Sequence, residues 1–285
     1  MWNVVKEFYQ LPELQEINRL PMANAGIPVA EFGKCPETSP LKLSLDGEWK
    51  FMLCGSVAEV PETFAEPGFD DAGWGTIPVP SNWTCQDKGD IPIYTNVQMP
   101  FDNQPPLVPE ENPTGLYRRS FRVPESWRGR RVVIHVGAAE SCLEVYCNGK
   151  FIGLGKDTRL PSEFELTPAL DFDGENVLAC RVIRWSDSSY IEDQDQWWMA
   201  GIYRSVYLYA TRESYFADIF SNGDLDVGSG RGLLRVEIRL GMDVAFFLKQ
   251  VGGVNGIRGP EQDFTVSARL LDADGGEVWR GEKIV

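Results

Sequence analysis

Residues 185–204 read Trp-Ser-Asp-Ser-Ser-Tyr-Ile-Glu-Asp-Gln-Asp-Gln-Trp-Trp-Met-Ala-Gly-Ile-Tyr-Arg and separate two runs of alternating apolar residues. Such alternation indicates β-strands with one buried face, so this stretch is predicted to connect two strands. It contains three carboxylates and two tryptophans, namely Glu192, Asp193, Asp195, Trp197 and Trp198. Because carboxylates accept strong hydrogen bonds from hydroxyl groups, the stretch is either a site for a polyhydroxylated ligand or an acidic loop whose tryptophans pack the fold.

The composition limits the classes of partner. The chain has 285 residues, 43% of them apolar, and a formal net charge of −15. This length predicts about two domains with a packed core. Nucleic acids and anionic membranes require clustered Lys and Arg, so the charge argues against both. The charged N-terminus does not resemble a signal peptide, and no apolar run is long enough to cross a membrane, so we expect a cytoplasmic protein.

Cysteine and histidine usage argues against a zinc site. The six cysteines are at positions 35, 54, 85, 142, 147 and 180, and His135 is the only histidine. Zinc sites need Cys or His ligands at short spacing, which this sequence does not offer. We expect six reduced and mostly buried thiols, and a packed or hydrogen-bonded His135 on a strand.

Short alternating segments predict the fold class. Residues 131–136 and 143–147 each place apolar side chains on one face, and Asn148-Gly149 follows the second segment as a strong hairpin signal, with residues 151–154 pairing back. Further strands are predicted at residues 45–53, 116–123, 177–183 and 202–209. Many short strands with almost no helical periodicity predict an all-β jelly-roll sandwich, with a helical turn only at residues 162–170.

The chain is predicted to divide into three parts. Residues 1–40, which contain five prolines, are an arm that lies on a later part of the protein or on a partner subunit, or a disordered tail. Residues 41–211 form the sandwich. Residues 212–285 have too few strands for a second sandwich, with a turn at 221–226 and a flexible insertion at 251–260, so we expect an incomplete domain.

Residues 56–116 are rich in Pro, Gly and Asn, and an irregular stretch this long favours a site. Within this stretch and beyond it lie Pro80-Ser-Asn-Trp83, Pro92-Ile-Tyr-Thr-Asn-Val97, Glu111-Asn-Pro-Thr-Gly115, Arg159-Leu-Pro-Ser-Glu-Phe164 and Arg184-Trp-Ser-Asp187 through Arg204. These five motifs resemble, in the same order, those of the β-galactosidases of glycoside hydrolase family 2. The resemblance extends from about residue 18 to residue 208.

The resemblance implies a domain order. The family has a jelly-roll sugar-binding domain, an immunoglobulin-like domain and then a (β/α)₈ barrel with the catalytic glutamates. By resemblance, residues 41–211 are the sugar-binding domain, residues 212–285 are part of the immunoglobulin-like domain, and the barrel is absent from this chain. Family members are usually oligomeric, so a homo-oligomer is expected of the full-length enzyme.

The resemblance also selects the site residues. Asn96 and Asp195 match the family's galactose-binding positions, and Asp195 also matches a ligand of its sodium ion. Oxygen ligands without histidine suit such a hard cation. The magnesium ion of the full-length enzyme has no ligands in this chain. From its chemistry alone, Asn96 can hold a sugar hydroxyl, or its amide can cap its own loop.

Other polar and aromatic residues are expected to have structural roles. Glu192 and Asp193 are predicted to brace the loop or to lie on the surface. Trp197 and Trp198 are predicted to pack the domain against its neighbour rather than to stack on sugar. Arg159 and Arg184 are each expected to pair with nearby acids.

The chain is expected to lack the chemistry of the family. A retaining glycosidase needs two carboxyl groups about 5 Å apart, and in this family the acid/base follows an asparagine. The sequence contains no Asn-Glu pair. A catalytic pair of Glu192 and Asp195 is disfavoured, because three residues on a loop fix no distance. The resemblance thus implies the N-terminal part of a β-galactosidase, inactive by itself; the alternatives are a stand-alone carbohydrate-binding protein and an assembly piece whose arm makes oligomer contacts.

Overall fold

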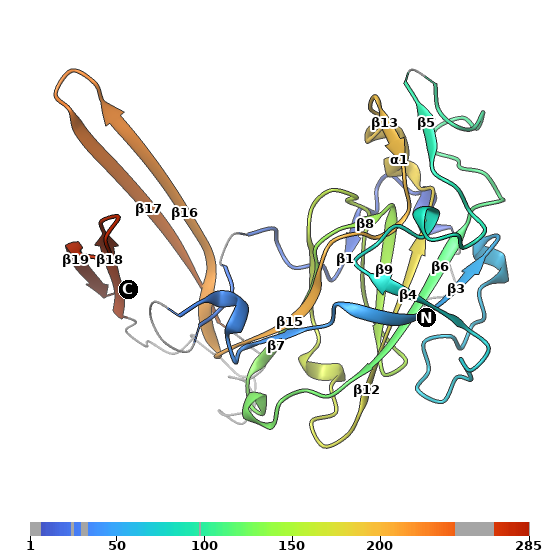
Figure 1. The fold of residues 1–285 in the computed structure, drawn as a ribbon, viewed down its shortest axis with the longest axis horizontal. Helices are drawn as coiled ribbons and strands as arrows, with labels where there is room; N and C mark the ends of the chain where they lie inside the picture. Colours follow the sequence, from blue (N-terminus) through green and yellow to red (C-terminus); the bar gives the residue numbers. More distant parts are fainter. Residues whose placement is uncertain (1–6, 24–25, 30–33, 97, 243–264, 285) are drawn as a thin grey trace, which may run out of the picture. The chain divides into compact units, whose positions relative to one another are not determined.

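The computed structural model describes residues 7–23, 26–29, 34–96, 98–242 and 265–284 (Figure 1). Its main body is a sandwich of two antiparallel sheets. The larger sheet has the order β1 (Glu16–Ile17), β10 (Lys150–Gly155), β9 (Cys142–Cys147), β12 (Asn176–Ile183), β6 (Thr114–Phe121), β3 (Gly47–Cys54) and β4 (Gly75–Val79). The smaller has the order β11 (Ser162–Glu165), β7 (Arg131–Val136), β15 (Val206–Thr211) and β2 (Lys42–Ser44). The predicted all-β sandwich is therefore confirmed.

The core lies between the two sheets. Trp49, Phe51 and Tyr117 from the larger sheet and Ile134 and Leu208 from the smaller belong to one buried cluster. The Phe51 and Tyr117 rings meet edge to face with centroids 4.9 Å apart. Full burial of a large apolar side chain stabilises by about 1.5–3 kcal/mol, so this cluster supplies the main stabilisation of the sandwich.

The hairpin at Asn148-Gly149 is confirmed. The two residues join β9 to β10 and have φ angles of 52° and 77°, the left-handed region that a tight hairpin turn requires. Strand β7 has the predicted bounds, and Phe164 of β11 pairs with its Ile134. The alternating segments therefore form strands where the sequence predicts them.

The helical predictions are partly wrong. Residues 162–165 form strand β11 at the edge of the smaller sheet, and the alternating residues Ser162 and Phe164 are buried. Only Thr167–Ala169 makes a 3₁₀ turn, η6. The one α-helix of the described residues, α1 (Asp187–Ile191), lies in the stretch predicted as a connection. Ser186 is the N-cap of this helix, and the Ser189 hydroxyl oxygen accepts the Ser186 N–H, as in a capping box. The other 3₁₀ turns are η1 (Phe8–Gln10), η2 (Pro36–Thr38), η3 (Val57–Glu59), η4 (Trp83–Cys85) and η5 (Glu125–Trp127).

Two pairs of short strands lie outside the main sheets. Strand β5 (Ile93–Thr95) pairs with β13 (Gln196–Trp198), and β8 (Ala139–Glu140) pairs with β14 (Gly201–Ile202). Figure 1 shows β5, β13 and α1 together at one end of the sandwich. The long stretch from residue 56 to 116 is thus fixed partly by pairing with residues a hundred positions later.

The described part of the N-terminal arm lies on the sandwich. Strand β1 pairs with the edge strand β10, and the Asn18 side chain donates to the Ile152 carbonyl at 2.9 Å. Tyr9 is buried. Three expectations were given for the arm, and residues 7–20 fulfil the first of them, contact with a later part of the chain.

The C-terminal segments form two separate hairpins. These are β16 (Ser214–Asp226) with β17 (Arg231–Met242), and β18 (Thr265–Leu271) with β19 (Glu277–Ile284). The predicted turn at 221–226 is wrong, because β16 continues through it and the chain reverses at residues 227–230. There Asp226 accepts the Gly228 N–H at 3.0 Å, and Gly230 has φ 68°.

Contacts divide the chain into residues 1–243 and 244–285. The predicted boundary near residue 211 and the immunoglobulin-like character of residues 212–285 stay predictions. The predicted insertion at 251–260 lies outside the described residues. None of the helices in the described ranges is long and apolar enough to cross a membrane.

Candidate functional site

The two predicted sugar-binding residues come from neighbouring strand ends. In the β5–β13 pair, Thr95 lies opposite Gln196 and Tyr94 opposite Trp197. Asn96 directly follows β5 and Asp195 directly precedes β13, so each is the chain neighbour of one member of the Thr95–Gln196 pair. Residues 99 positions apart in sequence are therefore brought to one end of a two-stranded ribbon.

The Asp195 carboxylate is held by a tyrosine that the sequence did not single out. The Tyr94 hydroxyl donates to Asp195 Oδ1 at 2.6 Å, and this hydrogen bond raises the pKa of Tyr94. Asp195 Oδ2 and the exposed Asn96 amide make no hydrogen bond within the described part of the chain. They remain available to a ligand, with one carboxylate oxygen already fixed.

The side chains of Trp197 and Trp198 have different roles. The Trp197 ring is 53% exposed and lies 5.5 Å from the Tyr94 ring, which is 51% exposed. Trp198 is buried, meets the Trp185 ring edge to face at 5.4 Å, and donates from Nε1 to Thr95 Oγ1 at 2.6 Å. Trp198 thus packs inside its own domain and holds the two strands together, whereas Trp197 lies on the surface. Packing of either ring against a neighbouring domain stays a prediction.

Glu192 braces a loop, as predicted. Its Oε1 accepts the Thr158 N–H at 2.9 Å, and burial raises its pKa. Asp195 accepts its hydrogen bond from the Tyr94 hydroxyl, so the Glu192 and Asp195 carboxylates have different partners. Asp193 is half-buried, and its Oδ1 has no hydrogen-bond partner among the described residues.

Arg184 fixes the start of β5. Its buried guanidinium forms an ion pair with Asp90 and donates to the Ile91 carbonyl at 3.0 Å. The Trp83 indole also donates to Asp90, with Nε1 and Oδ2 2.8 Å apart. The prediction that Arg184 pairs with an acid is confirmed, and the partner lies three residues before β5.

The other predicted pairings lie away from the β5–β13 strands. Arg159 Nη1 lies 4.0 Å from Glu140 Oε2. His135 Nδ1 is 2.8 Å from Glu163 Oε1, and its ring stacks on Tyr207 with centroids 4.4 Å apart. The predictions for Arg159 and His135 are thus confirmed.

The cysteines have no place in the candidate site. All six are free, and positions 54, 142, 147 and 180 are buried. Burial raises the pKa of the Cys142 and Cys180 thiols. A thiol must ionise to act as a nucleophile or metal ligand, so these two are inert core residues.

Glu140 gives the fold a pH dependence. Its side chain is almost wholly buried, Oε2 has no hydrogen-bond partner among the described residues, and burial raises its pKa to about 7. Between its ordinary pKa of 4.5 and 7, the folded state keeps a proton that the unfolded state releases. Stability therefore falls as pH rises through this window, and the loss is complete above it.

The variant Glu140→Gln is expected to remove this dependence. The amide still accepts the Met199 N–H, so urea unfolding at pH 8 should give a free energy up to about 3 kcal/mol higher than that of the unmodified chain, with little difference at pH 4. Glu48→Gln, at an exposed carboxylate of β3, is the matched control. Equal pH profiles for Glu140→Gln and the unmodified chain would contradict this role.

The described residues do not complete a metal site. No group of three or more His, Cys, Asp or Glu side chains in the described ranges has the arrangement of a metal centre. The Asp195 carboxylate and the Asn96 carbonyl are oxygen donors of the kind that suits a hard cation. The sodium site stays a prediction.

Comparison with known proteins supports the class that the fold and site define, a sugar-binding domain. Residues 42–212 match the model of the glycosyl hydrolases family 2 sugar binding domain. The chain therefore belongs to glycoside hydrolase family 2.

Curated relatives share this sequence over a limited part of their length. A beta-galactosidase of Vibrio cholerae is 46% identical over 197 residues, which are 69% of this chain and 19% of that relative. A beta-galactosidase of Aeromonas hydrophila is 36% identical over 295 residues, covering 97% of this chain and 28% of the relative. The chain thus spans 19% to 28% of the length of these two relatives.

Solved structures share the fold at lower identity. A beta-glucuronidase of Bacteroides uniformis matches with a TM-score of 0.64 and 22% identity, over 86% of this chain and 26% of that chain. A beta-glucuronidase of Bifidobacterium dentium matches with a TM-score of 0.60 and 21% identity, over 86% and 40%. At this identity the likeness shows the fold alone.

Proposed function

We propose that this chain is the N-terminal part of a β-galactosidase that hydrolyses terminal non-reducing β-D-galactose residues with retention. The curated relatives named beta-galactosidase support the activity. The observation that supports the role of this chain is the pairing of β5 with β13, whose paired ends adjoin Asn96 and Asp195. The chain supplies binding groups for galactose, and the catalytic glutamates belong to a barrel outside it.

The proposed role of each group follows from its chemistry. The Asp195 carboxylate accepts hydrogen bonds from sugar hydroxyls, which are stronger than hydrogen bonds between neutral groups. The Asn96 amide both donates and accepts, so it fixes the orientation of a hydroxyl. The Tyr94 hydroxyl donates to one Asp195 oxygen at 2.6 Å. This hydrogen bond fixes the plane of the carboxylate and so sets the direction of its other oxygen.

Asp195 is also proposed as a sodium ligand. A monovalent cation beside the sugar supplies positive charge that orients hydroxyl oxygens. Asp195 and Asn96 would contribute oxygens, and the ligands that complete the site lie outside this chain. Magnesium of the full-length enzyme would likewise bind outside it. We also propose a cytoplasmic location, which the six free thiols support. The full-length enzyme is proposed to be a homo-oligomer.

The chain alone is expected to show no turnover of a chromogenic β-galactoside, while a longer protein that contains it and continues into the barrel should hydrolyse the substrate. Release of nitrophenol measures both. Hydrolysis by the chain alone that disappears in Glu192→Gln would overturn the proposal, because it would assign catalysis to the 192–195 stretch.

A stand-alone carbohydrate-binding protein is the second candidate. The half-exposed rings of Tyr94 and Trp197 beside Asp195 favour it, because aromatic faces cover the apolar side of a sugar. Calorimetric titration of the chain with galactose separates the two functions. A binding module should bind galactose unaided, whereas half of a site should bind it only very weakly.

A further inference from the structure

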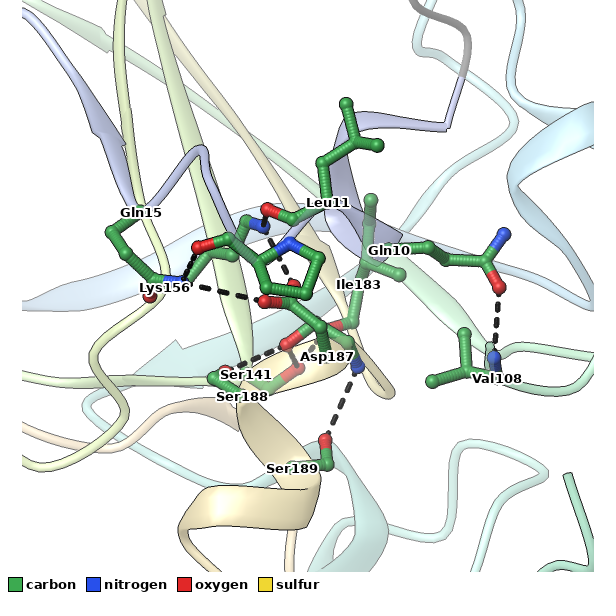
Figure 2. Close-up of polar contacts among 12 residues, drawn as sticks. Gln10, Leu11, Gln15, Val108, Ser141, Lys156, Ile183, Asp187, Ser188 and Ser189 are labelled. Atoms are coloured by element: carbon green, nitrogen blue, oxygen red, sulfur yellow. Dashed lines mark hydrogen bonds and ion pairs between the residues drawn. The ribbon is translucent and has the colours of Figure 1, made fainter. Parts of the chain in front are cut away.

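A lysine is fully buried at the junction between the N-terminal arm and helix α1. Lys156 is 1% exposed. Its Nζ donates to Asp187 Oδ1 at 2.6 Å and to the Leu11 carbonyl at 2.9 Å (Figure 2). A buried ammonium needs compensating oxygens, and here one comes from the arm and one from the helix.

The arm contacts the same pair a second time. The Lys156 N–H donates to the Gln15 carbonyl at 3.2 Å, and Gln15 Nε2 lies 3.4 Å from Asp187 Oδ2. Gln10 Oε1 accepts the Val108 N–H at 2.8 Å. The arm is therefore joined to the sandwich by side chains as well as by the two residue pairs of β1.

The segment at residues 156–158 holds both ends of α1. Asp187 is the first residue of the helix and pairs with Lys156. Glu192 is its C-terminal cap and accepts the Thr158 N–H at 2.9 Å. Three residues after Glu192 comes Asp195. A displacement of α1 would therefore move the start of β13.

Apolar contacts connect the arm to the same strands. Tyr9 belongs to a buried cluster with Trp185 and Trp198, and Phe8 and Ile93 pack against it. Trp198 lies on β13 and Ile93 on β5. The arm thus forms part of the surface on which the β5–β13 ribbon rests.

We propose that Lys156 is a positioning residue whose buried ammonium couples the N-terminal arm to α1, so that the arm holds the ribbon that carries Asp195. Without the ammonium, Asp187 would be a buried carboxylate without a cation, and the Leu11 carbonyl would lose its donor. Water would have to enter to solvate both groups, which separates the arm from the helix.

Hydrogen exchange on this chain tests the coupling. In Lys156→Met, peptides that cover residues 7–20 and 186–198 are expected to exchange at least about tenfold faster, while peptides from β6 and β12 stay protected. Lys150→Met is the matched control, because Lys150 is the first residue of β10, the strand that ends just before Lys156, and its side chain is exposed. Equal acceleration in the control, or no acceleration in Lys156→Met, would overturn the proposal.

A double variant separates local coupling from general destabilisation. Lys156→Met with Asp187→Asn removes both charges, so the melting temperature should recover toward that of the unmodified chain. Fast exchange of residues 7–20 should persist, because the Leu11 carbonyl still lacks its donor. If protection of the arm returned along with the melting temperature, the ammonium would not be what holds the arm.

The expected effect of Lys156→Met on Asp195 rests on the proposed function. It is measured in the longer protein that contains this chain and continues into the barrel. There Lys156→Met should raise the sodium concentration for half-maximal activity and the KM more than it lowers kcat, and Lys150→Met should change neither. Unchanged sodium dependence would overturn the link to Asp195. If Asp195→Asn itself had no effect, the proposed site would fail, whereas the exchange result on the arm would stand.

Discussion

Replacing Trp83 by alanine is expected to lower the free energy of unfolding of this chain by about 3–5 kcal/mol. Trp83 is fully buried, packs on Phe51 with ring centroids 6.1 Å apart, and lies so close to Gly115 that a Cβ there would approach its ring to 2.7 Å. The variant opens a cavity where the backbone of β6 meets the ring. It also removes the indole donor to Asp90. Urea unfolding followed by circular dichroism measures the loss.

Trp83→Phe separates the two causes. Phenylalanine keeps one ring in the buried site, so it leaves a smaller cavity than alanine while also removing the hydrogen bond from Nε1 to Asp90, and a loss of about 1–3 kcal/mol is expected. Because Asp90 also pairs with Arg184 just before β5, both variants should loosen that strand. A loss below 1 kcal/mol in Trp83→Ala would contradict the account of this packing.

Replacing Asp195 by asparagine in a longer, active protein is expected to lower kcat/KM for a β-galactoside about 10- to 100-fold. Asparagine keeps the shape but removes the charge and replaces one acceptor oxygen by an NH₂ donor, so the charge-assisted hydrogen bonds to the carboxylate are lost. Hydrogen bonds to charged groups contribute about 1.5–3 kcal/mol, and 1.36 kcal/mol is tenfold in rate. Asn96→Ala should act in the same direction. Initial rates over a range of substrate concentrations measure both.

Asp173→Asn is the control for charge alone. Asp173 is exposed and pairs with Arg128, away from β5 and β13. It should leave kcat/KM unchanged. If Asn96→Ala and Asp195→Asn behaved like this control, the assignment of both residues to a binding site would be wrong.

The sheets could be predicted because their strands have local signals. Residues 132, 134 and 136 place apolar side chains on one face of their strand, and Asn148-Gly149 favours the positive φ that its hairpin uses. Strand β4 was not predicted. It contains Pro78, which cannot donate a ladder hydrogen bond, and it is tolerated because β4 lies at the edge of its sheet.

The elements around the candidate site depend on distant partners. Strand β5 has three residues and is fixed by β13, about a hundred residues later. Helix α1 has five residues, and its ends are held by the segment at 156–158. Helices this short are not stable by themselves in water. The local sequence indicates α1 only through Ser186 and Ser189, which form a capping box at its start.

The site residues were selected by resemblance, and the structure supplies their geometry. No property of the isolated sequence distinguishes Asp195 from Glu192 or Asp193, since all three are acids in one stretch. Tyr94 was missed, although it lies two residues before Asn96 and therefore on the same face of an extended strand. The hydrogen bond from Tyr94 to Asp195 is the contact that distinguishes Asp195 from its neighbours.

The most direct test of the Asn96–Asp195 site is a sodium titration of galactoside hydrolysis by the longer protein, with and without Asp195→Asn. We expect that sodium activates the unmodified protein and that Asp195→Asn needs far higher sodium concentrations or does not respond. The same half-saturating sodium concentration and the same kcat/KM in both proteins would contradict it.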